Sequence, residues 1–218
     1  MSARTVDLRA GLDDPLELDP VVEHLLAGGL VVHPSETVYG FGGLATESAV
    51  VALQRLKGRS DERPFLLLVS SPAALPELIW TAAARELATV FWPGALTLVL
   101  ADPGRSFPAG VRGATGGVAV RVSSHPVARA LVERLGRPMT STSANAPGAP
   151  PALTVEEAVA VARAGGDGDL WVLDAGPLPA SAPSTVVDCT AEEPVVVRAG
   201  ATPVDRLRCV LPGIRGNR

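Results

Sequence analysis

Short apolar runs and amphipathic stretches alternate along most of the chain. Apolar runs bounded by glycine, proline or polar residues predict strands over residues 30–33, 65–69, 96–100, 118–122, 170–173, 185–188 and 195–198. Apolar positions three and four apart predict helices over residues 19–27, 46–56, 72–78, 81–91, 126–135 and 155–164. Residues 34–43 are polar and rich in glycine, which predicts a loop.

The order of these elements indicates the fold class. Helices and strands are interleaved at first, whereas the last strands follow one another, which favours one mixed α/β domain with a twisted open sheet over a purely doubly wound fold. No segment is rich enough in linker residues to divide the chain. We therefore expect one domain over residues 1–202, then a short helix from Pro203 and a loose tail over residues 212–218.

Composition narrows the class of protein. With 218 residues, 47% of them hydrophobic and 19% charged, the chain is long enough for one substantial core and is not disordered. The net charge of −4 argues against a generic nucleic-acid coat protein. Lys57 is the only lysine among 19 basic residues, which makes it a candidate functional residue.

Cysteine and histidine are too few and too scattered for metal chemistry. Cys189 and Cys209 fit no zinc pattern, and none of His24, His33 and His125 lies at ligand spacing from another, so we predict no metal site. Two thiols suit a reducing compartment, and the acidic N-terminus shows no signal peptide. The longest apolar runs are too short to span a membrane, so we expect a cytoplasmic protein.

The glycine-rich stretch from His33 to Gly43 allows two interpretations. Gly40, Gly42 and Ala45 match a dinucleotide-binding G-x-G-x-x-A pattern, but six residues separate the glycines from the preceding strand, which disfavours it. In an extended backbone, three alternating hydroxyl side chains would share one face and suit a small polar ligand. These are Ser35, Thr37 and Tyr39; an ordinary Ser/Thr turn is the alternative.

Three further groups of polar residues favour an anion-binding pocket. Lys57, Arg59 and Arg63 form a cationic cluster that suits phosphates or carboxylates, although a solvated loop would look the same. In extended form, Ser141, Ser143 and Asn145 point the same way. Arg121 and Arg198 stand near strand ends, as rim residues or as anion ligands, and Ser184 begins another strand. Without a G-x-S-x-G elbow, serine nucleophilic catalysis is disfavoured, and the site would act by positioning and charge neutralisation.

Seven segments, in order, also resemble the motifs of a known family, the YrdC-like threonylcarbamoyl-AMP synthases. They are P-S-E-T-V-Y-G (34–40), K-G-R (57–59), W-P-G-A-L-T (92–97), V-R-V with H-P (120–126), S-A-N (143–145), S-T-V-V-D (184–188) and V-R-A-G (197–200). The resemblance implies a twisted mixed sheet with helices around a positively charged cavity. His33 departs from the usual tyrosine or phenylalanine of the family, Ala95 from a proline, and Leu68 from a histidine of some members.

The resemblance implies a reaction and a set of site residues. The family condenses L-threonine, bicarbonate and ATP to threonylcarbamoyl-AMP and pyrophosphate, the first step of N6-threonylcarbamoyladenosine formation in tRNA, and partner enzymes transfer the threonylcarbamoyl group. The implied threonine ligands are Thr37, Arg121, Ser141 and Ser184. The implied ATP ligands are Lys57, Arg59, Arg63, Ser143, Asn145 and Arg198, with Lys57 and Arg59 as catalytic residues.

Further expectations concern the metal, the lysine and the alternatives. Mg²⁺ is expected to enter bound to ATP. Because Lys57 is expected in a loop, its replacement by alanine should reduce activity with little loss of fold. One alternative is a YrdC-like paralogue that binds tRNA or double-stranded RNA without making the adenylate; it would show salt-sensitive RNA affinity. Another is a carbamoyl-transfer relative that uses carbamoyl phosphate, although such modules usually belong to much longer chains.

Overall fold

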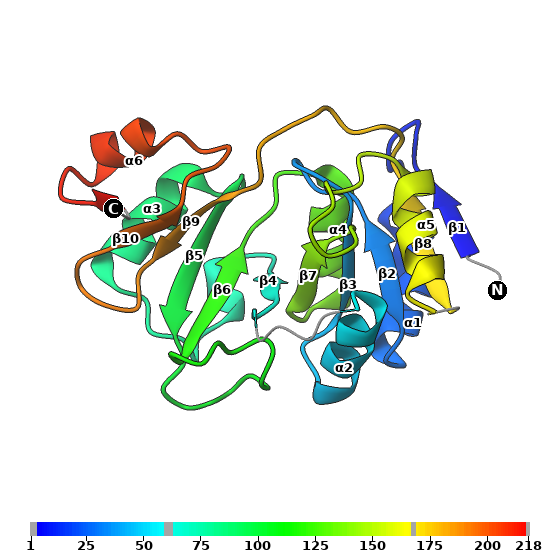
Figure 1. The fold of residues 1–218 in the computed structure, drawn as a ribbon, viewed down its shortest axis with the longest axis horizontal. Coiled ribbons are helices and arrows are strands. Elements are labelled where there is room, and N and C mark those ends of the chain that lie inside the picture. Colours follow the sequence, from blue (N-terminus) through cyan, green and yellow to red (C-terminus); the bar gives the residue numbers. More distant parts are fainter. Residues whose placement is uncertain (1–3, 59–62, 167–168, 217–218) are drawn as a thin grey trace.

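The computed structural model describes residues 4–58, 63–166 and 169–216. These residues form one eleven-stranded sheet of order β1-β8-β2-β3-β7-β4-β6-β5-β9-β10-β11, with both parallel and antiparallel pairs (Figure 1). The strands are β1 (Arg4–Asp7), β2 (Leu30–His33), β3 (Gly40–Leu44), β4 (Leu66–Leu68), β5 (Leu96–Ala101), β6 (Gly117–Arg121), β7 (Met139–Ser143), β8 (Leu170–Asp174), β9 (Thr185–Asp188), β10 (Val195–Arg198) and β11 (Arg215–Gly216). The predicted mixed α/β class with a twisted sheet is confirmed.

Local signals in the sequence set the ends of the helices. Thr154 accepts a hydrogen bond from the backbone of Glu157, whose side chain reaches back to the cap, so the predicted capping box starts α5. Gly136 ends α4 in the left-handed conformation, with φ of 63°. The α-helices are α1 (Asp19–Leu26), α2 (Glu47–Leu56), α3 (Ala82–Phe91), α4 (Pro126–Leu135), α5 (Val155–Ala164) and α6 (Val204–Val210), with 3₁₀ turns η1 (Pro15–Leu18) and η2 (Pro72–Ala74).

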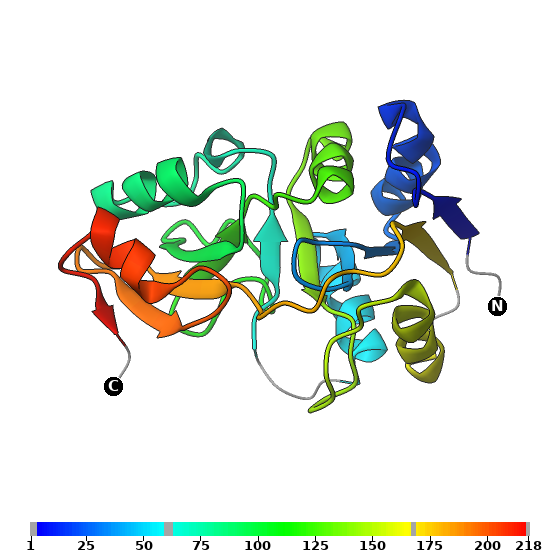
Figure 2. The ribbon, with the colours of Figure 1, turned by 90° about the horizontal axis from the view of Figure 1, so that it is seen from above.

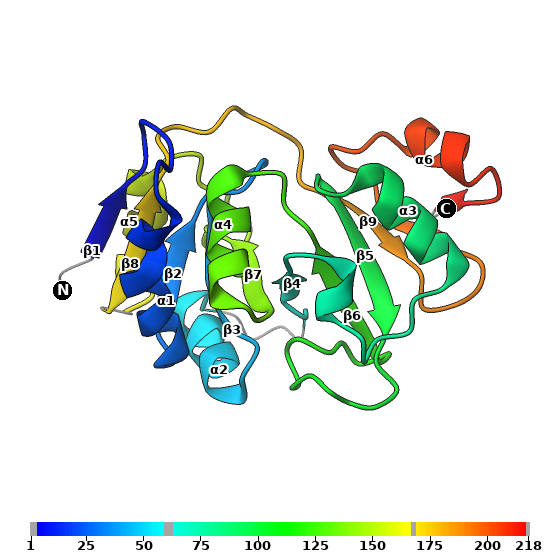
Figure 3. The same ribbon diagram turned by 180° about the vertical axis from the view of Figure 1, so that it is seen from behind.

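Helices cover both faces of the sheet. In Figure 1, α2 lies in front of β3 and α5 in front of β8, whereas Figure 3, the view from behind, shows α1, α4 and α3 in front. The view from above in Figure 2 shows how strongly the sheet twists along its length. One apolar cluster joins α1 and α4 to the sheet through residues such as Val31, Met139 and Leu131. A larger one includes residues of α2, α3, α5 and most of the strands.

Three expectations from the sequence are wrong. Residues 40–44 form strand β3 rather than loop, because β2 and β7 pair with it on its two sides. The segment after α6 is not a loose tail over its described part, since Val195 and Val196 of β10 pair with β11 and Ile214 is buried. In addition, the helix expected over residues 72–78 is only the short 3₁₀ turn η2.

Candidate functional site

The strand register brings several predicted site residues to one face of the sheet. Leu68 pairs with Arg121 on one side and with Met139 on the other. Side chains of paired residues share a face, and so do residues two apart in one strand. Arg121 of β6 and Ser141 of β7 therefore lie on the same face, as does Gly42, the partner of Ser141 in β3.

Around Arg121 lies a buried polar group that we call the Arg121 cluster: Glu36, Arg121, Ser123 and His125. Arg121 Nη1 is 3.6 Å from Glu36 Oε1, and the Arg121 side chain is only 4% exposed. Ser123 donates to Glu36 Oε2 and accepts from the backbone N–H of His125. Three buried atoms of the cluster nevertheless have no hydrogen-bond partner among the described residues: Glu36 Oε1, Arg121 Nε and His125 Nδ1. Such atoms are rare in native interiors and are candidates for ligand contacts.

Burial dominates the electrostatics of this cluster. Desolvation lowers the pKa of Arg121, and the carboxylate of Glu36 opposes that shift. The pKa of His125 is lowered by desolvation as well, again against Glu36. Because burial penalises the charge of Arg121, a ligand carboxylate beside its guanidinium would offset part of that cost.

The first polar motif forms a turn beside the Arg121 cluster. Ser35 donates to the carbonyl of Val38 at 2.7 Å and lies 3.2 Å from the hydroxyl of Thr37, which is buried. Tyr39 does not share a ligand-facing row with them. Its hydroxyl donates to Gly176 O at 2.7 Å and accepts from Ala175 N at 3.0 Å, so it joins β3 to the loop after β8. The expectation of three aligned hydroxyls is therefore wrong, and the Ser/Thr turn is observed.

Arg198 and Ser184 contact each other near the edge of the sheet where β6 ends. The guanidinium of Arg198 donates to Ser184 O at 2.8 and 3.1 Å and to its hydroxyl at 3.2 Å. Ser184 Oγ is also 2.9 Å from Thr97 Oγ1 of β5. Desolvation, followed by the positive charge of Arg121, lowers the pKa of Arg198. The two arginines are thus close enough to interact, which gathers positive charge at this edge.

Lys57 is the centre of a second polar group, the Lys57 cluster, with Ser143 and Asn145. Lys57 is the C-cap residue of α2 and is only 3% exposed. Its Nζ lies 2.7 Å from Ser143 O, 2.6 Å from Asn145 O and 2.7 Å from Asn145 Oδ1, and Ser143 Oγ donates to Asn145 Oδ1 at 2.6 Å. Lys57 lies in the turn after α2, which agrees with the expected loop position, and its ammonium also binds the S-A-N segment.

Two predicted cations remain, Arg59 and Arg63. Arg59 lies outside the described residues. Arg63 is exposed and lines a cavity of about 390 Å³ with Val99, Ala119 and the loop of residues 113–117. Because Ala119 is two residues before Arg121 in β6, this cavity opens on the same face as Arg121.

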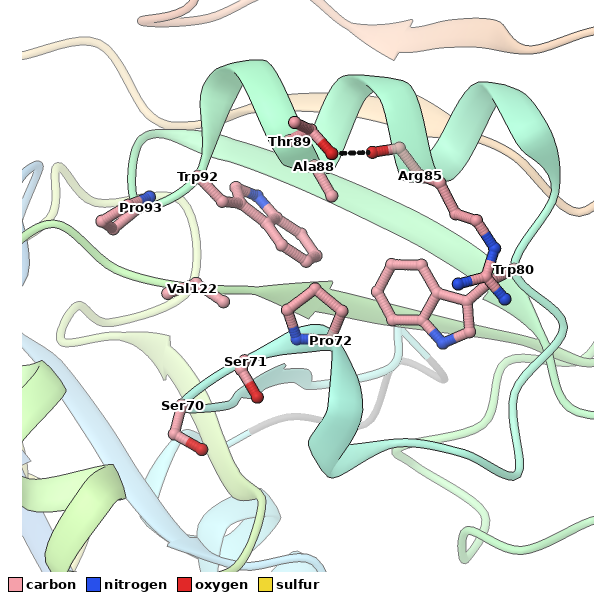
Figure 4. A pocket seen from close by; sticks show the side chains of 10 residues that line it. All are labelled: Ser70, Ser71, Pro72, Trp80, Arg85, Ala88, Thr89, Trp92, Pro93 and Val122. Carbon is pink, nitrogen blue, oxygen red and sulfur yellow. Dashed lines mark hydrogen bonds between the residues drawn. The ribbon is translucent and has the colours of Figure 1, made fainter.

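Another cavity, of about 480 Å³, lies between α3 and the segment after β4 (Figure 4). Its walls include Trp80 and Trp92, whose ring centroids are 6.0 Å apart at 89°, together with Pro72 and Arg85. None of the site residues predicted from the sequence lines it. Within the described part of the chain, no group of three or more His, Cys, Asp or Glu side chains could hold a metal ion, and no helix is long and apolar enough to cross a membrane.

Four contributors to the site were missed in the sequence: Glu36, Thr97, Ser123 and His125. Glu36, Thr97 and His125 stand inside the quoted motifs, and Ser123 stands between two quoted segments. A carboxylate between two hydroxyl residues before a glycine-rich strand was the available signal for Glu36. Ser123 contacts Glu36 and Thr97 contacts Ser184, in each case 87 positions away, so neither contact has a local signal in the sequence.

The fold and the two clusters define an α/β protein whose twisted mixed sheet carries two groups of polar and charged side chains. The family model of the Sua5/YciO/YrdC domain, described as "Telomere recombination", matches residues 23–200. The chain belongs to this Sua5/YciO/YrdC family.

Relatives agree with this assignment. A Mycobacterium tuberculosis protein, provisionally named a threonylcarbamoyl-AMP synthase, is 42% identical over 85% of this chain and 84% of its own length. A Stenotrophomonas maltophilia protein named threonylcarbamoyl-AMP synthase is 40% identical over 65% of this chain and 78% of its own.

Solved structures agree as well. Pyrococcus abyssi Sua5 complexed with L-threonine superposes with a TM-score of 0.88 at 30% identity, covering 100% of this chain and 63% of that one, so the present chain spans about three fifths of Sua5. Escherichia coli YciO superposes with a TM-score of 0.79 at 27% identity over 94% of this chain and 98% of that one.

Proposed function

We propose that this chain is an L-threonylcarbamoyladenylate synthase, a nucleotidyltransferase that makes L-threonylcarbamoyl-AMP and pyrophosphate from L-threonine, bicarbonate and ATP. This reaction is the first step of N6-threonylcarbamoyladenosine formation in tRNA. Partner enzymes would transfer the threonylcarbamoyl group in the cytoplasm. The names of relatives that match the chain over most of their length support this activity.

The observation that carries the proposal is a pair of buried atoms in the Arg121 cluster that lack a hydrogen-bond partner among the described residues. An amino acid is a zwitterion, with one carboxylate and one ammonium group. Arg121 Nε is a donor without a hydrogen bond, and Glu36 Oε1, which is ion-paired with Arg121 Nη1 at 3.6 Å, is an acceptor without one among the described residues. We assign the threonine carboxylate to Arg121 and the amino group to Glu36. Thr37, Ser141 and Ser184 then complete the threonine side of the site.

The Lys57 cluster supports the nucleotide side. Ser143 and Asn145 follow Ser141 along and just beyond β7, so a nucleotide bound there would lie next to the amino acid. We propose that Lys57 acts by holding this S-A-N segment in shape, because its ammonium binds three oxygens of the segment. Arg59, Arg63 and Arg198 are the proposed phosphate ligands, and Mg²⁺ would enter on the triphosphate, whose oxygens it prefers.

The chemistry suits a site that works by charge neutralisation. The threonine nitrogen, once deprotonated, takes up bicarbonate with loss of water and becomes a carbamate. A carbamate oxygen attacks the α-phosphorus of ATP while the bond to pyrophosphate breaks, so no redox partner is needed. Negative charge grows on the phosphate oxygens in the transition state, and preorganised arginines stabilise it. The positive charge at Arg121 and Arg198 therefore falls where substrate carboxylate and phosphates would meet.

The test is a reconstituted reaction of the full chain with L-threonine, bicarbonate, Mg-ATP and pyrophosphatase. Mass spectrometry should detect threonylcarbamoyl-AMP, and its formation should require threonine and bicarbonate. Arg121→Met should abolish it, while Arg129→Met, which removes an exposed arginine of α4 paired with Glu133, should not. No threonine-dependent product, under conditions where a reference synthase is active, would reject the proposal.

The second candidate is the alternative expected from the sequence, a paralogue without synthase activity. A paralogue that binds RNA should show salt-sensitive affinity for tRNA or double-stranded RNA and form no adenylate. Measuring RNA binding at two salt concentrations beside the reaction above separates the two candidates.

A further inference from the structure

His33, the last residue of β2, reaches across a whole strand to contact Ser141. Its imidazole is fully buried and lies over Gly40 and Gly42 of β3. A Cβ atom at Gly40 would lie 3.2 Å from His33 Nε2, and one at Gly42 would lie 3.2 Å from His33 Cδ2. The two glycines therefore leave free the space that the ring occupies. This arrangement lets His33 Nε2 approach Ser141 Oγ of β7 to 3.1 Å.

The hydrogen bonds of His33 define its tautomer. Nδ1 is 3.1 Å from the carbonyl oxygen of Pro34, which can only accept, so Nδ1 carries the proton. A neutral imidazole has a single N–H group, so Nε2 carries a lone pair and must accept. The Ser141 hydroxyl is consequently the donor in the contact with Nε2.

The surroundings of the ring keep it neutral. Burial is the largest cause that lowers the pKa of His33, to about 4, and the charges of Arg121 and His125 act in the same direction. The carboxylate of Glu36 and the Pro34 carbonyl oppose the shift. Neutral His33 thus persists throughout the physiological pH range.

A serine whose proton is already given to histidine can only accept further hydrogen bonds. Threonine offers two donors, its amino group and its β-hydroxyl, and we have assigned the amino group to Glu36. We propose that His33 is a positioning residue: it fixes Ser141 as the acceptor of the threonine β-hydroxyl and thereby lets the site select threonine over amino acids without that hydroxyl. This inference rests on the proposed function for its substrate, while the contact of His33 with Ser141 stands without it.

Removing the imidazole should reduce this selectivity. In His33→Phe, the Ser141 hydroxyl has no acceptor for its own buried proton when its oxygen accepts a hydrogen bond from threonine. The affinity for threonine should therefore fall by roughly a factor of ten. His33→Gln is the conservative variant, because its amide oxygen can replace Nε2 as the acceptor. A site built around a substrate hydroxyl discriminates strongly against analogues that lack it.

Binding calorimetry with L-threonine and L-2-aminobutyrate, which lacks the hydroxyl, tests the proposal. The unmodified chain should prefer threonine by roughly tenfold or more, His33→Phe should lose most of that preference, and His33→Gln should keep it. Ser141→Ala should resemble His33→Phe, and adding His33→Phe to Ser141→Ala should change nothing further if the two residues act as one unit. His24→Gln, a matched change in α1, should keep the preference.

Two outcomes would overturn the proposal. The first is an unchanged threonine preference in a folded His33→Phe, or additive effects of His33→Phe and Ser141→Ala. The second is a His33 that carries its proton on Nε2, seen in ¹⁵N spectra of histidine-labelled protein with His33→Gln assigning the signal. Failure of the unmodified chain to bind threonine would instead contradict the proposed function as well, and the spectra would still report on the tautomer.

Discussion

The Lys57 cluster and the Arg121 cluster are both buried and polar, yet they differ in how their atoms are satisfied. In the first, the ammonium and the Ser143 hydroxyl contact protein oxygens at 2.6–2.7 Å. In the second, Glu36 Oε1, Arg121 Nε and His125 Nδ1 have no partner within the described residues. A buried unsatisfied group costs about 1–3 kcal/mol. The first cluster therefore stabilises the fold, whereas the second holds unused hydrogen-bonding capacity that a ligand can use.

The largest expected effect on activity comes from replacing the charged side chains of Arg121 and Glu36 by uncharged ones. Arg121→Met combined with Glu36→Gln removes both members of the buried ion pair. We expect threonine-dependent turnover to fall roughly 1,000-fold or more, since the proposed contacts to both charged groups of threonine are lost. Stability should stay the same or rise, because replacing a buried ion pair by uncharged residues is often neutral or favourable. Turnover and urea unfolding of the same preparation measure both.

Arg121→Met alone provides the control for that double change. It leaves Glu36 buried without its counter-ion, so it should be less stable than the double variant. If the double variant unfolded more easily than Arg121→Met, the cluster would be a structural element, and the contrast between the two clusters would fail.

The second prediction removes the amine from the Lys57 cluster. Lys57→Met keeps most of the apolar stem but leaves three oxygens of Ser143 and Asn145 without the ammonium. We expect the free energy of unfolding to fall by about 3 kcal/mol, since three partly buried acceptors lose a charged donor. Urea unfolding measures the change. Arg55→Met, an exposed position in the last turn of the same helix, is the matched control and should change stability by less than about 0.5 kcal/mol.

A Lys57→Met protein of unchanged stability that fails only to bind ATP would reverse this interpretation. It would return Lys57 to the role of a direct phosphate ligand, as the K-x-R resemblance implies. ATP affinity and unfolding free energy therefore need to be measured on the same sample.

The sequence predicted elements well wherever the signal was local. Strands β9 and β10 and helices α4 and α5 begin and end at the predicted residues, because a proline, a glycine cap or a capping box marks several of these ends. β3 was missed since G-F-G-G-L has the composition of a loop, and only its pairing with β2 and β7 makes it a strand.

The motifs located site residues but did not reveal their partners. Lys57 contacts residues 86 and 88 positions away, and the Tyr39 hydroxyl contacts Gly176, 137 positions away. Whether a polar side chain faces a ligand or another part of the protein depends on such distant contacts. For that reason the sequence placed Lys57 and Tyr39 on the ligand side, and the structure places their polar atoms on protein oxygens.

A third prediction uses the pH dependence of stability to test whether His33 stays neutral in the folded protein. His33 is buried and neutral, with its pKa lowered to about 4, while an unfolded histidine has the ordinary value of 6.5. Between these values the unfolded chain binds a proton that the folded chain does not, so stability falls as the pH falls. From pH 7 to pH 5 this contribution amounts to about 2 kcal/mol.

The measurement is urea unfolding of the unmodified chain and His33→Gln at both pH values. The variant should lose about 2 kcal/mol less on acidification, while groups common to both proteins cancel. The charged and titratable neighbours are Arg121, His125 and Glu36, and all three remain in the variant. Parallel losses in the two proteins would mean that His33 accepts a proton in the folded state, which would also release the Ser141 hydroxyl.

Tyr39→Phe should have the smallest effect of these changes. It tests whether a residue of a binding motif must itself contact the ligand. Tyr39 belongs to the same P-S-E-T-V-Y-G segment as Thr37, but its hydroxyl bridges Ala175 N and Gly176 O. Deleting that oxygen should lower the free energy of unfolding by about 1 kcal/mol, the net value of neutral hydrogen bonds. Threonine affinity should stay within about twofold of the unmodified value, because no bond of the hydroxyl faces the site. Thr37→Val should show the opposite pattern, with weaker threonine binding and nearly unchanged stability. A Tyr39→Phe protein with normal stability and impaired threonine binding would place its hydroxyl with the Arg121 cluster instead.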